Sequence, residues 1–312
     1  MISRALGLAL GVAADRIFGD PKKHHPVAWF GAFAARLEAP LYSDGVPAGA
    51  AYTAATVAPV VGLGVAAERL TRRNPVLHTL ATALATWAVL GARSLAAEGD
   101  TMADRLEVGN LEQAREQLPN LCGRDASQLD APELARATVE SMAENTADAA
   151  VASLFWGAIA GIPGLLGHRA VNTLDAMVGR RNARYGRFGT ASARLDDALD
   201  YLPARLTGAL ASALAPTVGG SARRAWAITL RDAENHPSPN GGWCEAAWAG
   251  ALNVQLGGRN AYASRVEERG LLGDGPRPGA PEVRRAAELV RVVTGAAGAL
   301  AAAAALLKRR KK

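Results

Sequence analysis

Five stretches of the chain contain no Asp, Glu, Lys or Arg, and each is about long enough to cross a bilayer as a helix. A hydrocarbon core of about 30 Å needs roughly 17 to 25 helical residues. The stretches are residues 45–67, 76–92, 149–167, 206–222 and 292–307. They are rich in alanine and glycine, which enter lipid less readily than leucine but let neighbouring helices approach closely. The pattern predicts an all-α, polytopic membrane bundle. The alternative is a soluble, alanine-rich protein with buried helices.

The charge and cysteine content indicate neither a nucleic-acid partner nor a disulfide-rich fold. The 312 residues carry a formal charge of +6, but the basic residues are scattered and aromatic residues make up only 5%. A nucleic-acid-binding surface needs clustered basic residues. Cys122 and Cys244 lie far apart with no CxxC pattern, which indicates neither a disulfide framework nor a zinc cluster and fits a reducing compartment.

The polar segments between the uncharged runs predict helices and loops. No sustained alternation of apolar and polar residues with β-branched enrichment is present, so we expect helices almost throughout. A helical hairpin is expected over 48–70 and 76–97. A soluble helical insert is expected over 98–147, in which Asp130 caps a helix. The segment 233–243 predicts a turn-rich loop.

Three carboxylates, Glu140, Glu144 and Asp148, are spaced four residues apart directly before an uncharged run. On a helix this spacing aligns them on one face, with Asn145 beside them. A solvated helix face is one interpretation. In an apolar setting, adjacent carboxylates repel each other and are costly without a cation. A Mg²⁺ ion with phosphate would remove that repulsion, so the stripe is a candidate metal site.

Residues 169–206 alternate acids with arginines. The candidates for a site in this segment are Asn172, Asp175, Arg180, Asn182, Arg184, Arg194, Asp196 and Asp197. The alternation fits a surface helix crossed by salt bridges. It also fits a site in which carboxylates hold Mg²⁺ and guanidinium groups hold phosphate.

The loop "HPSPN" is both constrained and polar. Two prolines and the glycines that follow fix its backbone, and Asn235, His236, Ser238 and Asn240 offer polar groups. A loop of this kind more often binds a ligand than merely connects two helices.

The N-terminal region carries a second proline-bounded loop, "GDPKKHHP", with Asp20 and His25 as candidate binding residues. It has neither Walker spacing nor the paired glycines of a dinucleotide fingerprint, and the alternative is a basic turn at a membrane surface. The preceding "MISRALGLALGVAADR" is similar to a short signal peptide. We expect an uncleaved helix instead, because cleavage after Ala14 would fall directly before "DRIFGDP".

Taken together, three blocks resemble the CobD/CbiB family of cobalamin biosynthesis, the adenosylcobinamide-phosphate synthases. They are "DRIFGDPKKHHPVAWFG", the block from "ESMAENTADAAVASLFWGAIAG" to "LDDALDYLPARL", and "HPSPNGGWCEAAWAGALNVQLGG". Their order and spacing match, and the resemblance covers essentially the whole chain. The long central block and the HPSPN loop are specific, whereas the first loop alone is not.

The resemblance implies a single membrane domain over 1–312, with the insert at 98–147 and the main polar catalytic region at 168–288. It implies ATP- and Mg²⁺-dependent joining of adenosylcobyric acid to (R)-1-amino-2-propanol phosphate, or ethanolamine phosphate, through an amide bond. The expected partners are the corrinoid, the amino-alcohol phosphate, membrane lipid and later enzymes of the pathway. No nucleic-acid partner is expected.

The residue roles follow from that reaction. Metal or amine binding is expected from Glu140, Glu144, Asp148, Asp196 and Asp197, with Glu144, Asp148 and Asp196 as metal ligands. Phosphate binding is expected from Arg180, Arg184 and Arg194. Nucleotide or other substrate contacts are expected from Asp20, His25, Asn145, Asn172, Asp175, Asn182, Asn235, His236, Ser238 and Asn240.

Two rival functions use the same residues. One is a membrane Mg²⁺-dependent phosphotransferase or phosphatase, and the other is a non-catalytic corrinoid-binding scaffold. The positive-inside rule places "TRRN" and the terminal "KRRKK" in the cytoplasm, which would put the "GDPKKHHP" loop and the 98–147 insert outside, away from ATP. We expect the active-site loops of this bacterial inner-membrane protein to be cytoplasmic. One apolar run would then be re-entrant, or the hairpin would violate the rule.

Overall fold

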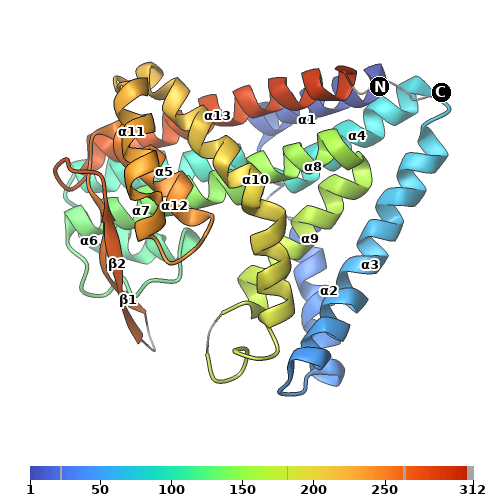
Figure 1. Cartoon of the computed structure of the whole chain (residues 1–312), viewed down its shortest axis with the longest axis horizontal. Coiled ribbons are helices and arrows are strands. Elements are labelled where there is room, and N and C mark those ends of the chain that lie inside the picture. Colours follow the sequence, from blue (N-terminus) through green and yellow to red (C-terminus); the bar gives the residue numbers. More distant parts are fainter. Residues whose placement is uncertain (22, 181, 263–264, 308–312) are drawn as a thin grey trace. The chain divides into compact units, whose positions relative to one another are not determined.

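The computed structural model describes residues 1–21, 23–180, 182–262 and 265–307. Lys22 of the first loop, Arg181 of the Arg/Asp segment and the terminal "KRRKK" lie outside the described residues. Within them the chain is helical apart from a two-stranded sheet (Figure 1), which confirms the all-α class. The helices are α1 (Ile2–Phe18), α2 (Pro26–Leu41), α3 (Val46–Thr71), α4 (Pro75–Val89), α5 (Ala92–Glu107), α6 (Leu111–Gln117), α7 (Ala131–Asn145), α8 (Ala152–Ala160), α9 (Ile162–Val178), α10 (Thr190–Leu214), α11 (Ala222–Asp232), α12 (Gly241–Leu252) and α13 (Ala280–Leu307). Short 3₁₀ or π segments are η1 (Leu118–Asn120), η2 (Thr146–Val151), η3 (Ala215–Val218) and η4 (Ala233–Asn235), and the strands are β1 (Leu256–Tyr262) and β2 (Arg265–Leu272).

Helix starts follow the capping chemistry of the sequence. Asn74 accepts hydrogen bonds from the backbone N–H groups of Val76 and Leu77 at the start of α4. Asp130 accepts one from the backbone N–H of Glu133, which confirms it as the cap of α7. Such side chains satisfy N–H groups that have no partner within the helix.

Among the described residues, three helical stretches are long and apolar enough to cross a membrane: Val46–Thr71, Pro75–Glu107 and Ala280–Leu307. They correspond to three of the five uncharged runs, and the second stretch comprises α4 and α5 with a break at Leu90 and Gly91. The other two runs do not form single helices of spanning length. Run 149–167 breaks at Gly161, where φ is 74° and α8 gives way to α9. Run 206–222 breaks at Gly219, where φ is 79° after η3.

The contact clusters of the chain divide it into two compact units. The first unit is Met1–Gly91, Asp148–Asp200 and Ala297–Lys312, and the second is Ala92–Ala147 and Tyr201–Ala296. The single membrane domain expected from the sequence, with its insert and catalytic region, stays a prediction.

Small residues allow close helix packing in the first unit, where α4 packs mainly against α1 and α3 packs mainly against α9. A Cβ on Gly7 would lie 2.5 Å from Cβ of Thr82, and one on Gly11 would lie 2.3 Å from Cβ of Thr86. Only glycine permits this separation between α1 and α4. The expected hairpin is therefore modified, because α3 and α4 each pack mainly against another helix and α4 ends at Val89.

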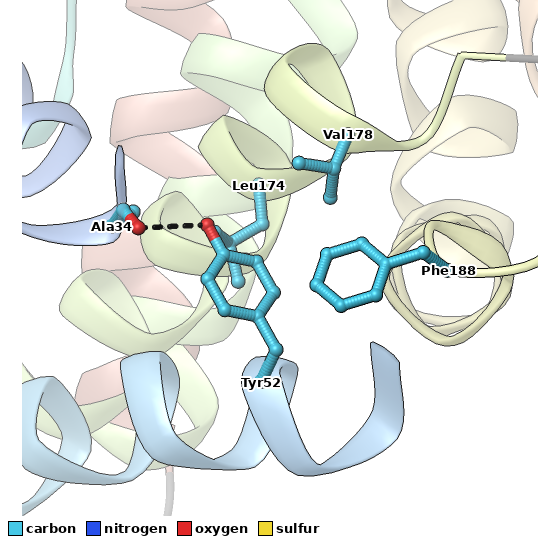
Figure 2. Packing of buried hydrophobic residues seen from close by; sticks show 5 residues of the cluster. All are labelled: Ala34, Tyr52, Leu174, Val178 and Phe188. Carbon is cyan, nitrogen blue, oxygen red and sulfur yellow. Dashed lines mark hydrogen bonds between the residues drawn. The ribbon is translucent and has the colours of Figure 1, made fainter. Parts of the chain in front are cut away.

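A buried aromatic cluster holds Phe188, just before α10, in the first unit (Figure 2). The rings of Tyr52 and Phe188 lie with centroids 5.1 Å apart and are packed against Leu174 and Val178. The Tyr52 hydroxyl donates a hydrogen bond of 3.1 Å to the carbonyl of Ala34. The cluster thus joins α2, α3 and α9 to the start of α10.

The two strands were not predicted. β1 and β2 pair antiparallel, with Gly258 opposite Arg269 and an irregular register between Leu256 and Gly258. Gly257 and Gly258 have φ values of 76° and 94°, a backbone region that side chains disfavour. Their sequences lack apolar alternation, which is why periodicity did not reveal them.

Candidate functional site

A cluster of ionisable side chains is buried in the second unit. Glu144 at the end of α7, His236 after η4 and Glu245 in α12 place one ligand atom each within 4.8 Å of one another. Nε2 of His236 lies 3.2 Å from Oε1 of Glu245. Arg269 of β2 places Nη1 3.0 Å from Nε2 of His236 and 3.6 Å from Oε1 of Glu245. Glu245 is 0% exposed and His236 is 7% exposed, whereas Glu144 is half-buried.

The HPSPN loop holds His236 against the first turn of α12. Nδ1 of His236 accepts a hydrogen bond of 3.1 Å from the backbone N–H of Ser238. The Ser238 hydroxyl oxygen accepts bonds from the N–H groups of Asn240 and Gly241 at 3.3 and 3.1 Å, so it caps the start of α12. Glu245 follows Gly241 by four residues and therefore lies on the same face of the helix. The motif thus brings the imidazole and the second carboxylate together.

The charges within the cluster shift one another. Burial and the nearby charge of Glu245 raise the pKa of Glu144 to about 7. Burial alone would lower the pKa of His236, but the nearby carboxylate of Glu245 raises it overall. Burial likewise opposes the charge of Arg269, but Glu144 and Glu245 outweigh it and raise the pKa. Two carboxylates therefore stabilise positive charge at this position.

Glu140 lies in a separate contact within the same unit. It is 1% exposed, which excludes the solvated-face interpretation for this residue. Arg124 donates to one carboxylate oxygen, and Arg136 and the backbone N–H of Gly257 donate to the other at 3.0 and 2.7 Å. Burial alone would raise the pKa of Glu140, but Arg124 and Arg136 lower it overall. Glu140 thus joins α7 to β1, and its expected catalytic role in metal or amine binding stays a prediction.

The predicted acidic stripe is not a regular helical face. The α-helix ends at Asn145 and continues as the π segment η2, which has a wider turn. Asp148 therefore does not follow Glu144 at α-helical spacing, and the expected alignment was wrong at this point. Glu144 belongs to the second unit, whereas Asp148 and Asp196 belong to the first, so the predicted metal set stays a prediction.

A group of aspartates gathers between α9 and α10 in the first unit. Burial, followed by the charges of Asp200 and Asp175, raises the pKa of Asp196 to about 9, while Asn172 hydrogen-bonds to it. Burial and the charges of Asp197 and Asp200 raise the pKa of Asp175 to about 6. The structure thus brings Asn172, Asp175 and Asp196 together, as expected for members of one site.

His168 and Asp200 complete this region and were absent from the predicted site. Nε2 of His168 lies 2.7 Å from Oδ1 of Asp200, and Nδ1 lies 3.1 Å from the Ser153 hydroxyl. Both residues are almost fully buried. A histidine at the end of an apolar run, followed by an acid 32 residues later, carries no spacing signal that would pair them.

The arginines predicted to bind phosphate occupy different settings. Nε of Arg180 donates to the carbonyl of Ala176 at 3.2 Å. Nη2 of Arg184 donates to Glu38 at 2.8 Å, and its guanidinium carbon lies 4.1 Å from the centroid of Tyr42. Arg194 is exposed on α10, as is Asp197. Their role in substrate binding stays a prediction.

Several predicted polar residues make structural hydrogen bonds, and their substrate contacts stay predictions. Asn182 accepts bonds from the N–H groups of Arg184 and Tyr185 at 3.0 and 2.8 Å. Asn145 donates to the carbonyl of Ser141 at 2.8 Å, and Asn235 donates to that of Leu271 at 3.3 Å. Asn240 accepts a bond of 3.4 Å from Arg205.

The first proline-bounded loop forms an acid–histidine pair within the first unit. Oδ1 of Asp20 lies 3.3 Å from Nε2 of His25, whose Nδ1 accepts from the N–H of Val27 and caps α2. Burial lowers the pKa of nearby Arg169, and the charges of Asp20 and Asp148 oppose this effect. The negative charges of Asp20 and Asp148 thus both act on the partly buried guanidinium group of Arg169.

Sequence reasoning missed Glu245 and Arg269. Glu245 is the only acid in the otherwise apolar helix "GGWCEAAWAGAL", and a charge in such a helix is a signal that could have found it. Arg269 lies on an unpredicted strand and carried no comparable signal. The two residues complete the cluster around His236.

The donor set of the cluster does not match Mg²⁺, the ion implied by the family resemblance. Mg²⁺ prefers oxygen ligands in octahedral geometry and usually reaches a protein through one or two carboxylates and substrate phosphates. Glu144 and Glu245 supply oxygen, but His236 supplies an imidazole nitrogen. The set better suits divalent ions that accept nitrogen.

Comparison with known proteins assigns the chain to a family. The family described as CobD/Cbib protein matches residues 8–290. The chain is 51% identical to "Cobalamin biosynthesis protein CobD" of Mycobacterium tuberculosis strain H37Rv, over 99% of this chain and 97% of that protein. It is 42% identical to the protein of the same name from Geobacter metallireducens over 86% of each chain, and 39% identical to that from Chromobacterium violaceum over 98% of each. No solved structure matches the chain. The chain therefore belongs to the CobD/CbiB family.

Proposed function

We propose that this protein acts in cobalamin biosynthesis as an ATP-dependent amide ligase. It joins the free carboxyl group of adenosylcobyric acid to the amine of (R)-1-amino-2-propanol phosphate, or of ethanolamine phosphate, and gives adenosylcobinamide phosphate. Family membership supports the pathway, since the relatives carry the name cobalamin biosynthesis protein. The single observation that carries the proposal is the buried cluster of Glu144, His236, Glu245 and Arg269.

The reaction requires an activated acid, because a carboxylate and an amine do not condense at neutral pH. The substrate carboxylate takes the γ-phosphoryl group of ATP, giving an acyl phosphate and ADP. The amine nitrogen then attacks the carbonyl carbon, the carbon–oxygen bond to phosphate breaks, and one proton leaves the nitrogen. ATP enters as its Mg²⁺ complex, which neutralises phosphate charge during transfer.

The residues of the cluster fit a reaction that moves anionic phosphates. Arg269 is held charged by Glu144 and Glu245 and can pair with phosphate oxygens from within a largely buried site. Burial strengthens such an interaction because fixed charges act in a medium of low dielectric constant. Ion pairs with Glu245 and Glu267, both at 3.6 Å, orient the guanidinium group of Arg269 before a substrate binds.

Arg205 offers a second guanidinium beside the HPSPN loop. Its guanidinium carbon lies 3.5 Å from the ring centroid of Tyr201 and 5.0 Å from that of Trp243, and its Nη1 donates to Asn240. Stacking on the aromatic rings fixes the plane of the guanidinium group. Arg205 and Asn240 are our candidates for contacts with the nucleotide or with the amino-alcohol phosphate.

The setting proposed for this chemistry is the bacterial plasma membrane, with several helices spanning it and the active-site loops on the cytoplasmic side. Three spanning-length helices support membrane insertion. The cytoplasmic side supplies ATP. A complex with later enzymes of the pathway would receive the product there.

The test is a reconstituted reaction with the full chain in detergent or nanodiscs. It contains adenosylcobyric acid, Mg–ATP and each amino-alcohol phosphate in turn, and it follows product and ADP by chromatography and mass spectrometry. We expect one ADP for each amide formed and no product without ATP. Amide formation at an equal rate without ATP, or phosphate release from a lipid phosphate without corrinoid, would reject the proposal.

A further inference from the structure

The geometry of three side chains in the second unit is that of a metal site. Glu144, His236 and Glu245 come from two helices and the loop between η4 and α12, yet one ligand atom of each lies within 4.8 Å of the others. A metal ion bound at about 2.0–2.2 Å to nitrogen and carboxylate oxygen places its ligand atoms at such separations. Three protein ligands leave further coordination positions for water or a substrate.

Glu245 points to a cation independently of this spacing. It is 0% exposed, and among the described residues neither of its carboxylate oxygens accepts a hydrogen bond of acceptable geometry, although His236 Nε2 lies 3.2 Å and Arg269 Nη1 lies 3.6 Å from Oε1. A buried ionised carboxylate is costly unless it is paired or coordinates a metal. The side chain lies within the group formed by Glu144 and His236, so a cation placed among the three would satisfy it.

The surroundings of His236 suit metal ligation. Nδ1 lies 3.1 Å from the backbone nitrogen of Ser238 and 3.4 Å from its carbonyl oxygen. Either tautomer of the ring therefore has a backbone partner. When Nε2 binds a metal, the proton on Nδ1 can be donated to the Ser238 carbonyl, an arrangement that commonly fixes ligating histidines.

Gly241 leaves room beside these ligands. A Cβ at this position would lie 2.9 Å from Oε1 of Glu144, 2.9 Å from Cε1 of His236 and 3.1 Å from its Nδ1. A methyl group there would separate the carboxylate from the imidazole. Glycine thus keeps the two ligands close together.

We propose that Glu144, His236 and Glu245 bind one divalent metal ion that accepts imidazole nitrogen, such as Mn²⁺ or Zn²⁺, in preference to Mg²⁺. The mixed nitrogen and oxygen donors account for this preference. The site is distinct from the Mg²⁺ that accompanies ATP, and the inference does not depend on the ligation reaction.

Arg269 sets the affinity of this site. Its Nη1 lies 3.0 Å from His236 Nε2 and 3.6 Å from Glu245 Oε1, so its positive charge competes with a metal ion for the same two residues. Its Nη2 has further partners in the Tyr262 hydroxyl at 3.1 Å and Glu267 at 3.6 Å. Arg269 can therefore turn toward these two residues when a metal ion binds.

The test measures Mn²⁺ binding to the full chain after treatment with a chelator. Binding is followed by isothermal titration calorimetry and by the loss of the electron paramagnetic resonance signal of free Mn²⁺. We expect one ion per chain, bound more tightly than Mg²⁺. Glu245→Gln and Gly241→Ala should each weaken Mn²⁺ binding by at least about tenfold. His236→Ala should remove the preference over Mg²⁺, and Arg269→Gln should strengthen binding. Glu116→Gln, an exposed acid on α6 of the same unit, is the matched control and should change nothing.

A second measurement needs no variant. Pulsed electron paramagnetic resonance of Mn²⁺ bound to the unaltered chain should show coupling to a nitrogen nucleus, as expected for bound imidazole. Absence of Mn²⁺ binding, Mg²⁺ binding of equal strength, or binding without nitrogen coupling would each overturn the inference. Equal binding by Glu245→Gln with an unchanged melting curve would also overturn it. If the unaltered chain binds Mn²⁺ as expected but forms no amide product, that result would count against the proposed reaction and not against the metal site.

Discussion

Oε1 of Glu245 lies 3.2 Å from Nε2 of His236, which connects the middle of an apolar helix to the proline-rich loop that precedes it. Both side chains are nearly excluded from solvent. Since a buried carboxylate and a buried imidazole each cost free energy alone, their pairing keeps α12 and the loop in one arrangement. The HPSPN motif and Glu245 are therefore structurally coupled.

Removing the carboxylate of Glu140 should destabilise the second unit without changing its surface. Glu140→Ala leaves Arg124 and Arg136 buried without their common partner, which costs about 3–5 kcal/mol of unfolding free energy. Thermal melting in detergent, followed by circular dichroism, measures the effect. Glu116→Gln should have the melting temperature of the unaltered chain. If Glu140→Ala also has that melting temperature, the contacts of Glu140 with Arg124 and Arg136 contribute little to stability.

The aspartates of the first unit should make stability fall as pH rises. The pKa of Asp175 is raised from 3.8 to about 6 and that of Asp196 from 3.8 to about 9. The folded state therefore holds protons that the unfolded state has released between about pH 4 and these values, so this contribution to stability is lost across that window. Asp196→Asn mimics the protonated group, and its melting temperature should depend less on pH between 6 and 9. An unchanged slope would contradict the assignment.

The packing of α1 against α4 should tolerate no side chain at Gly11. A methyl group there would lie 2.3 Å from Cβ of Thr86, and forcing the helices apart costs about 1–3 kcal/mol. Gly62→Ala in α3 is the matched control, since a Cβ at that position has no atom within 4 Å. The melting temperature in detergent should fall for Gly11→Ala and stay unchanged or rise for Gly62→Ala. The opposite order would reject close packing of these helices.

Much of the fold could be predicted because helix signals are local. Asp130 caps α7 as expected, and three of the five uncharged runs correspond to α3, α4 and α13. The breaks at Gly161 and Gly219 were not predicted, because composition alone does not show where a glycine takes a positive φ. The hairpin of β1 and β2 was missed because its strands lack alternation and contain two successive glycines with positive φ.

The candidate site could be predicted only in part. His236 and Glu144 were found because they belong to short polar motifs beside apolar sequence. Glu245 and Arg269 were not found, since their importance arises from contacts between segments separated in the chain. Glu140 shows the reverse, because its spacing suggested a metal ligand, whereas Arg124, Arg136 and the backbone N–H of Gly257 occupy its oxygens.

The orientation in the membrane gives a further prediction. Cysteines introduced at Lys23 and Glu234, both exposed, should react with an impermeant maleimide in inverted vesicles and not in intact cells. Cys122→Ser removes the half-buried native thiol, and Cys244 is buried. Labelling of both positions only in intact cells would contradict the cytoplasmic placement of the loops.

The most direct test of the central claim compares amide ligation by Glu245→Gln and Glu116→Gln with that of the unaltered chain. Each protein receives adenosylcobyric acid, amino-alcohol phosphate and Mg–ATP, and melting curves verify that each is folded. We predict that Glu245→Gln lowers the rate of adenosylcobinamide phosphate formation by at least about a hundredfold, while Glu116→Gln leaves it unchanged. A folded Glu245→Gln protein that forms product within about twofold of the unaltered rate would contradict the claim that this buried cluster is the site of the reaction.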